Sequence, residues 1–159
     1  MKNLGEILIR PAEPGDEAAI LLCLNQAFGP YEAEYTPAAY ADTVPSEAAL
    51  AERLQRMHVL VASSPEGIVG TVAGAMTDGE GHLRGMAIIP EWRGSGLAAS
   101  LLAAIEKWLK DRGCRRVMLD TMLPLQTAIK FYEKNGYRRS RRIEDFFGMP
   151  LLEYVKELD

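Results

Sequence analysis

The segment 86–102 constrains this chain more than any other, because its periodicity and composition change within a few residues. An apolar run over 86–89 ends at Pro90, a short turn carries Arg93 and two glycines, and an apolar-periodic segment follows. This order predicts a strand, a glycine-rich turn and a helix. The free N–H groups and the positive dipole end at a helix start attract anions, most often phosphate. We therefore expect an anion site at residues 93–98.

The glycines of this turn have two readings. Gly94 and Gly96 allow the backbone to approach an anion closely, and Arg93 adds a fixed charge with several donors. Alternatively, both glycines only relieve steric crowding in a plain strand-to-helix turn. The turn is not a Walker loop, because no Gly-Lys-Ser/Thr follows, and it lacks the third glycine of a dinucleotide fingerprint. The turn alone leaves both readings open.

Composition narrows the class of protein. A chain of 159 residues with 48% apolar and 25% charged residues predicts one globular domain over 1–159, with a core from about 7 to 158. The net charge of −4 argues against nucleic acid as a partner, and no long apolar run predicts a membrane span. Cys23 and Cys114 lack metal-ligand spacing, so we expect buried thiols, no metal and a cytoplasmic location.

Hydrophobic periodicity predicts an α/β chain with the order β-α-α-β-β-β-α-β-α-β-β. Strands are expected at 7–9, 59–62, 68–76, 82–89, 117–121, 137–143 and 152–158, and helices at 14–28, 45–55, 97–113 and 124–135. Short turns make the three middle strands antiparallel, whereas a helical crossover makes 82–89 and 117–121 parallel. The expected fold is a mixed, mainly antiparallel central sheet with one helix-crossed parallel pair. Segment 31–45 is expected as a loop with a partly helical piece, and 146–150 as a loop.

Two segments together carry a family resemblance. Residues 90–98 resemble motif A of the GCN5-related N-acetyltransferases (GNAT), whose pattern Arg/Gln-x-x-Gly-x-Gly/Ala is met by Arg93, Gly96 and Ala98. Residues 128–137 resemble the Ala-x-x-Phe-Tyr-x-x-x-Gly-Phe segment of the same family. The two motifs occur in the family's order, and the resemblance covers essentially the whole chain.

The resemblance implies acetyl-CoA as cosubstrate. Its pyrophosphate would lie on the turn amides, with Arg93 in support; these amides belong to Gly94, Ser95, Gly96, Leu97 and Ala98. The pantetheine arm would pair with strand backbone at Met86, Ala87 and Ile88, where an N–H group can stabilise the oxyanion. Many family members have Asn where this chain has Leu125, so Gln126 beside it, or the backbone, is expected to hold the pantetheine.

The resemblance also implies catalytic side chains. Tyr132 aligns with the family's general acid, which protonates the departing thiolate, although its place on an apolar helix face also fits a core tyrosine. The base that deprotonates the amine stays open. His82 occupies the position of the family's carboxylate, Glu80 would point the same way, and Asp120 ends the following strand. A solvated hairpin end is the alternative for His82 and Glu80.

The sequence therefore predicts an N-acetyltransferase that moves an acetyl group from acetyl-CoA to a primary amine by direct attack in a ternary complex. The alternatives are a non-catalytic acyl-CoA-binding or sensor module, and an acyltransferase that uses another acyl-CoA. The acceptor is a small-molecule or peptide amine, bound near Tyr31, Tyr35, Tyr40 and the 146–150 loop, where Glu32 and Glu34 would attract a cation. A homodimer is compatible with the resemblance. The identity of the amine is not encoded in a recognisable motif.

Overall fold

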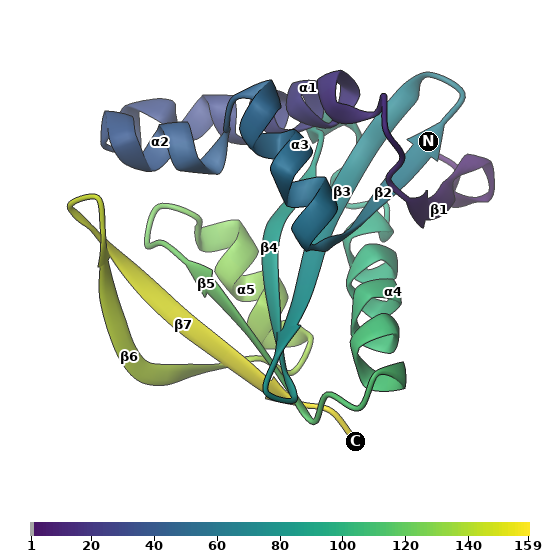
Figure 1. The fold of residues 1–159 in the computed structure, drawn as a ribbon. Coiled ribbons are helices and arrows are strands. Elements are labelled where there is room, and N and C mark those ends of the chain that lie inside the picture. Colours follow the sequence, from purple (N-terminus) through teal and green to yellow (C-terminus); the bar gives the residue numbers. More distant parts are fainter. Residues whose placement is uncertain (1) are drawn as a thin grey trace.

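The central sheet has seven strands in the order β1-β2-β3-β4-β5-β7-β6 (Figure 1). The computed structural model describes residues 2–159. Its strands are β1 (Leu8–Pro11), β2 (His58–Ser64), β3 (Gly67–Thr77), β4 (Glu80–Ile88), β5 (Arg116–Thr121), β6 (Arg138–Phe146) and β7 (Met149–Glu157). β4 and β5 are parallel and every other neighbouring pair is antiparallel, which confirms the predicted fold class.

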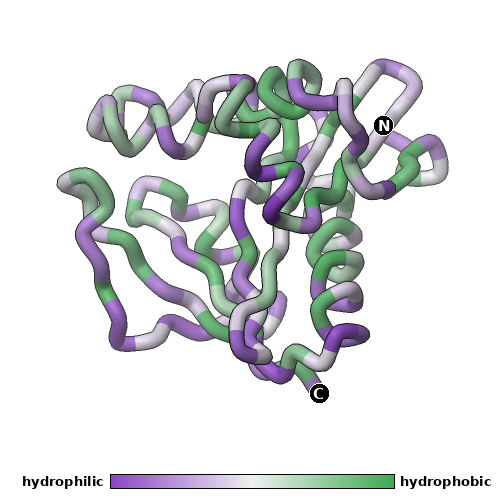
Figure 2. Tube along the Cα trace, in the orientation of Figure 1, coloured by the Kyte–Doolittle hydropathy of each residue, from purple (hydrophilic) through white to green (hydrophobic). Residues whose placement is uncertain are grey.

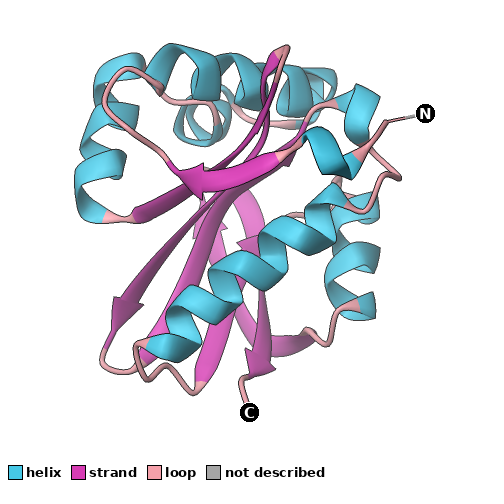
Figure 3. Ribbon diagram, turned by 90° about the vertical axis from the view of Figure 1, so that its right-hand side faces the viewer, coloured by secondary structure: helices cyan, strands magenta, loops and turns pink. Residues whose placement is uncertain are grey.

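Helices cover both faces of the sheet (Figure 3). They are α1 (Glu17–Phe28), α2 (Pro37–Thr43), α3 (Glu47–Arg56), α4 (Leu97–Asp111) and α5 (Gln126–Lys134), with 3₁₀ turns at Leu4–Glu6, Gly29–Glu34 and Pro90–Trp92. α1 and α3 pack on one face, and α4 and α5 pack on the other. Within the described residues 2–159, no helix has the length and apolar character that crossing a bilayer requires.

The alternation of side chains along β2 explains why both faces bear helices. Val59 and Val61 belong to the core cluster beneath α1 and α3, whereas Leu60 and Ala62 belong to the cluster beneath α4. A strand covered on both faces is a continuous apolar run, as the sequence shows here. α4 instead alternates between apolar and polar residues along its length, because only one of its faces is buried (Figure 2).

A β-bulge in β4 bends this strand away from β5. The β3–β4 register shifts between Thr71, which opposes Ala87, and Ala73, which opposes Arg84, so β4 carries one extra residue. Gly85 lies in this bulge with φ +64°, a conformation that glycine adopts without strain. Pairing between β4 and β5 covers only residues 80–83 of β4. Beyond that point the two strands separate, as Figure 1 shows.

Two segments differ from the sequence prediction. Segment 31–45, expected as a loop with a partly helical piece, forms a 3₁₀ turn and then the regular helix α2, which Thr36 caps by accepting a hydrogen bond from the Ala39 N–H at 3.3 Å. The expected loop 146–150 is only a two-residue turn at Phe147 and Gly148, whose φ values are +50° and +89°. Positive φ at both central positions is typical of a tight hairpin turn. Only these two residues therefore separate the end of β6 from the start of β7.

Candidate active site

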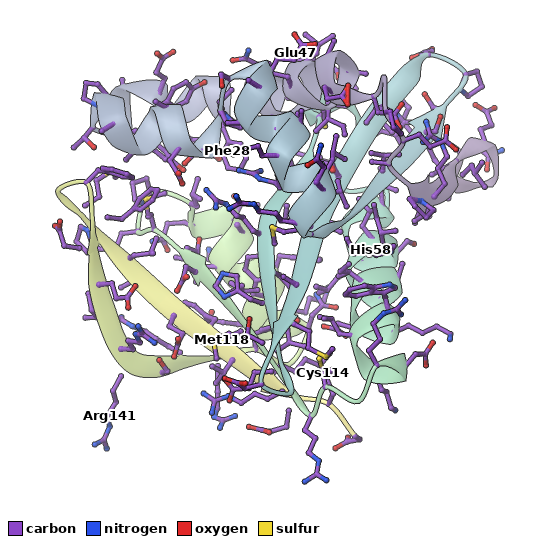
Figure 4. All side chains as sticks on the ribbon, in the orientation of Figure 1. Phe28, Glu47, His58, Cys114, Met118 and Arg141 are labelled. Atoms are coloured by element: carbon purple, nitrogen blue, oxygen red, sulfur yellow. The ribbon has the colours of Figure 1, made fainter. Side chains whose placement is uncertain are left out.

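A cavity of about 820 Å³ lies where β4 and β5 separate. The 93–98 turn and the start of α4 line one end of it, and residues of α2, α3 and the β6–β7 hairpin line the other. Phe28, at the end of α1, contributes to the cavity wall on the side of α1 and α3 (Figure 4). The cavity therefore joins the predicted anion site to the region expected to bind the acceptor.

The turn before α4 presents unpaired amides to this cavity. Gly94 and Gly96 have φ values of +76° and +90°, and a Cβ on Gly94 would meet no atom within 4 Å. The Ser95 hydroxyl donates to the Trp92 carbonyl at 2.5 Å and accepts from the Leu97 N–H at 3.3 Å. Within residues 2–159, no hydrogen bond engages the Gly94 or Gly96 amide. These open donors at a helix start fit an anion such as a pyrophosphate.

Arg93 is held at the edge of the same turn. Its Nη2 donates to the carbonyl oxygen of Ala27 at 3.3 Å, so the guanidinium is tied to the last turn of α1. The contact gives a hydrogen-bond donor to one of the last carbonyl groups of α1, which have no partner within the helix, and it fixes the position of the arginine. Arg93 therefore brings a positioned positive charge to the cavity, as expected from the sequence.

The edge of β4 beyond the bulge faces the cavity instead of a strand. Met86, Ala87 and Ile88 line the cavity, while on the opposite edge Ala87 and Ile88 pair with β3. An extended chain could therefore lie along this free edge as an additional strand pairs with a sheet. The free edge and the open turn amides fit the two parts of an acyl-CoA, the pantetheine arm and the pyrophosphate.

Tyr132 is both a core residue and a cavity-lining residue. It is 8% exposed and contacts the ring of Tyr137 edge-on, with 5.8 Å between ring centroids. Tyr132 also lines the cavity below β4. Burial raises the pKa of Tyr132, so the phenol keeps its proton at neutral pH and can donate a hydrogen bond. The two readings of the sequence are therefore compatible with each other.

His82 and Asp120 come together in the cavity, whereas Glu80 lies outside its lining. The Nε2 atom of His82 lies 3.8 Å from Oδ2 of Asp120, across the last paired part of β4 and β5. The side chain of His82 is 44% exposed and accessible to a ligand. Glu80 instead lies 3.9 Å from Nη1 of Arg116 at the far end of β4. Of the three candidate bases, His82 and Asp120 thus share one location.

Asp120 is expected to make the stability of the protein pH-dependent. Burial raises the pKa of Asp120, and the nearby His82 opposes this. The folded state then binds this proton more tightly than the unfolded chain, so stability falls as pH rises from the ordinary aspartate pKa through the raised one. Asp120→Asn should therefore raise Tm by a few degrees at pH 7 and have no such effect near pH 3, measured by thermal unfolding without ligand. A lower Tm at pH 7 would mean that attraction to His82 outweighs burial.

The remaining sequence-predicted residues lie as follows. The amide of Gln126 donates to the Leu123 carbonyl at 2.6 Å, and neither Gln126 nor Ser95 lines the cavity, although Leu125 does. Tyr31 and Tyr35 line the acceptor end, and Tyr40 packs edge-on against Tyr35. Cys23 and Cys114 are buried, and burial raises the pKa of Cys23 to about 12. No group of three or more metal-ligating side chains occurs within residues 2–159.

Sequence reasoning missed three charged residues of the acceptor end. Asp42 on α2, Arg53 on α3 and Arg84 on β4 all line the cavity, and Arg84 forms an ion pair with Asp42. None of them belongs to a motif, and the two helices are remote from β4 in sequence. The arginines at 138, 139, 141 and 142 of β6 form a denser basic run in the sequence, yet Arg141 points away from the molecule (Figure 4).

Comparison with known protein families identifies the family to which this fold and anion site belong. The family model described as the acetyltransferase (GNAT) family matches residues 23–137. This chain belongs to that family. The matched GNAT segment runs from α1 to the end of α5 and includes the bulged β4, the glycine turn and Tyr132.

Curated relatives match part of this GNAT chain. It is 34% identical over 80 residues to the aminoglycoside N(6')-acetyltransferase type 1 of Stenotrophomonas maltophilia, covering 50% of this chain and 52% of the relative. It is 33% identical over 77 residues to N-alpha-acetyltransferase 30 of Schizosaccharomyces pombe, covering 47% of this chain and 51% of that protein. The chain thus spans about half the length of the curated relatives it matches.

Solved structures extend the likeness to the whole fold. The PaiA N-acetyltransferase from Thermoplasma acidophilum, solved in complex with coenzyme A, superposes with a TM-score of 0.80 at 19% identity. The match covers 96% of this chain and 99% of that one. At this identity the likeness shows that the GNAT fold extends beyond the segment matched by the family model.

Proposed function

We propose that this protein transfers an acetyl group from acetyl-CoA to a primary amine by direct attack within a ternary complex. One observation carries the proposal: a single cavity joins the open turn amides, the free edge of β4, Tyr132 and the His82–Asp120 pair. Relatives named as an aminoglycoside N-acetyltransferase and an N-alpha-acetyltransferase support an amine acceptor, and the coenzyme A complex of the PaiA protein supports the donor.

The donor half of the site uses backbone groups. The open amides of Gly94 and Gly96, with that of Ala98 at the start of α4, would hold the pyrophosphate, while the Ser95 and Leu97 amides are engaged within the turn. Arg93 would add charge, and the free edge at 86–88 would hold the pantetheine arm. A backbone N–H on this edge would polarise the thioester carbonyl and stabilise the oxyanion that forms on attack. Fixing both reactants in one cavity supplies a further part of the rate enhancement.

The acceptor half must first remove a proton from the ammonium. His82 would take this proton, and the carboxylate of Asp120 at 3.8 Å would orient the imidazole and stabilise its charged form. The amine nitrogen then forms a bond to the acetyl carbon while the carbon–sulfur bond breaks. The protonated Tyr132 would give its proton to the departing thiolate. The products are the N-acetylated amine and coenzyme A as a free thiol.

Thiol release tests this function. The protein is incubated with acetyl-CoA and a panel of primary amines that includes aminoglycosides, amino acids and peptides with free N-termini, and free coenzyme A is measured. We expect thiol release that depends on one class of amine. Coenzyme A binding by calorimetry without turnover of any amine would favour the non-catalytic acyl-CoA-binding alternative. Faster transfer from propionyl-CoA or longer acyl-CoAs would favour the other acyltransferase reading.

A further inference from the structure

Arg53 reaches from α3 to the bulge in β4. Its half-buried side chain lines the cavity on the face of the sheet that bears α1 and α3. The Nη1 atom lies 3.0 Å from the point that a Cβ on Gly85 would occupy, so the absence of a side chain at Gly85 leaves room for the guanidinium. Arg53 is therefore placed on the acceptor side of the proposed reaction centre.

The guanidinium of Arg53 has no anionic partner within the described chain. Across residues 2–159, no carboxylate oxygen lies within 4.0 Å of it, and the nearby Asp42 forms its ion pair with Arg84. Burial, followed by repulsion from Arg84, lowers the pKa of Arg53 to about 10, and Asp42 opposes this in part. Two guanidinium groups share one carboxylate here, which leaves a surplus positive charge on the cavity wall.

The surplus charge lies close to the proposed base. Arg84, beside Arg53, is two residues from His82 on β4, a separation of roughly 6.5 Å along a strand. Both side chains line the cavity on the same face. A planar guanidinium with a free edge of donors can bind a carboxylate through two parallel hydrogen bonds. A small molecule can therefore place an amine at His82 and a carboxylate at Arg53.

A contact joins the start of α2 to the β6–β7 hairpin at the acceptor end of the cavity. The Thr36 hydroxyl donates to the Phe147 carbonyl at 2.8 Å, and the Thr36 N–H donates to the sulfur of Met149 at 3.4 Å. A buried cluster that includes Tyr35 and Met122 packs beside this contact. The contact fixes the position of the hairpin, whose Phe146 and Leu151 line the acceptor end.

We propose that the acceptor is a small amino acid whose carboxylate binds Arg53 while its amine faces His82 and Asp120. This proposal rests on the proposed acetyl transfer but concerns the acceptor pocket alone. An aminoglycoside, which carries several cations and no carboxylate, would place like charge beside Arg53. The proposed acceptor therefore differs in charge from the substrate named for the Stenotrophomonas maltophilia relative.

Matched pairs of acceptors test the role of the carboxylate. Each amino acid is compared with its carboxamide, and the set is extended with dipeptides and an aminoglycoside. With acetyl-CoA saturating, kcat/KM should be about 10- to 100-fold higher for the preferred amino acid than for its amide, because a charge-assisted pair is lost. Arg53→Gln should abolish this preference by lowering kcat/KM for the amino acid while leaving the amide nearly unchanged. Arg56→Gln, with the same charge change at an exposed site of α3, should keep it.

The outcomes separate this proposal from the proposed function. Equal or better transfer to amides, dipeptides or the aminoglycoside overturns the amino acid proposal and leaves acetyl transfer intact. If no amine is acetylated, the proposed function fails, and thermal shift of the coenzyme A-loaded protein then tests the pocket. A shift with the amino acid that is absent with its amide and absent in Arg53→Gln supports the proposal, and equal shifts overturn it. Unchanged coenzyme A affinity shows that Arg53→Gln is folded.

Discussion

Replacement of His82 by alanine is expected to lower kcat/KM for the amine about 10²- to 10⁴-fold, the usual contribution of a general base. His82 lines the cavity, is accessible and lies 3.8 Å from Asp120, so its loss removes the proposed proton acceptor without opening the core. The affinity for coenzyme A should be unchanged, because the turn amides and the free edge of β4 are backbone groups. Steady-state kinetics as a function of pH, with coenzyme A calorimetry as control, measures both quantities.

The pH profile distinguishes His82 from the other candidate on β4. His82→Ala should lower kcat/KM for the amine most at low pH, and a higher pH, which converts more of the acceptor to its free base, should partly restore the rate. Glu80→Gln should have a much smaller effect, since Glu80 lies beside Arg116 outside the cavity lining. If Glu80→Gln caused the larger loss of kcat/KM and His82→Ala kept the parent rate, the assignment of His82 as base would be wrong.

The sequence predicted the fold well because its strongest signals are local. The continuous apolar runs that become β2 and β3, the turn residues between them and the glycine turn before α4 are each signals that span about ten residues. The parallel pairing of β4 and β5 followed from the helix between them. Helix α2 was expected only as a partly helical piece without bounds, because its seven residues bury only Ala39 and show no apolar period. Its stability comes from packing against the β6–β7 hairpin, which is distant in sequence.

The site was predictable only where backbone conformation or a family motif encodes it. Gly94 and Gly96 mark a turn in the sequence, and both adopt a positive φ in the structure. Arg53 carries no such signal. An arginine in the last turn of an amphipathic helix usually points to solvent, and α3 carries another there, the exposed Arg56. Only the bulge at Gly85 and the pairing of Asp42 with Arg84 make Arg53 a buried charge without a partner.

Replacement of Tyr132 by phenylalanine is expected to lower kcat about 10²-fold while the dissociation constant of coenzyme A stays the same. The change removes only the hydroxyl, so the aromatic packing against Tyr137 and Phe131 is retained. No hydrogen bond to another residue within 2–159 engages this hydroxyl, and the variant should therefore be at least as stable as the parent. Stopped-flow thiol release and thermal unfolding measure the two effects.

Tyr137→Phe is the matched control, because the two tyrosines are neighbours with opposite hydrogen bonding. The Tyr137 hydroxyl donates to Oε2 of Glu106 at 2.7 Å, and Lys156 donates to the same carboxylate. Its loss should cost about 1.5–3 kcal/mol of stability, the range for a hydrogen bond to a charged group, and leave kcat unchanged. If Tyr132 is catalytic, Tyr132→Phe should lose rate and keep its stability, whereas Tyr137→Phe should lose stability and keep its rate. If Tyr132→Phe lost stability and kept its rate, Tyr132 would be a core residue, and proton donation to the thiolate would fall to water.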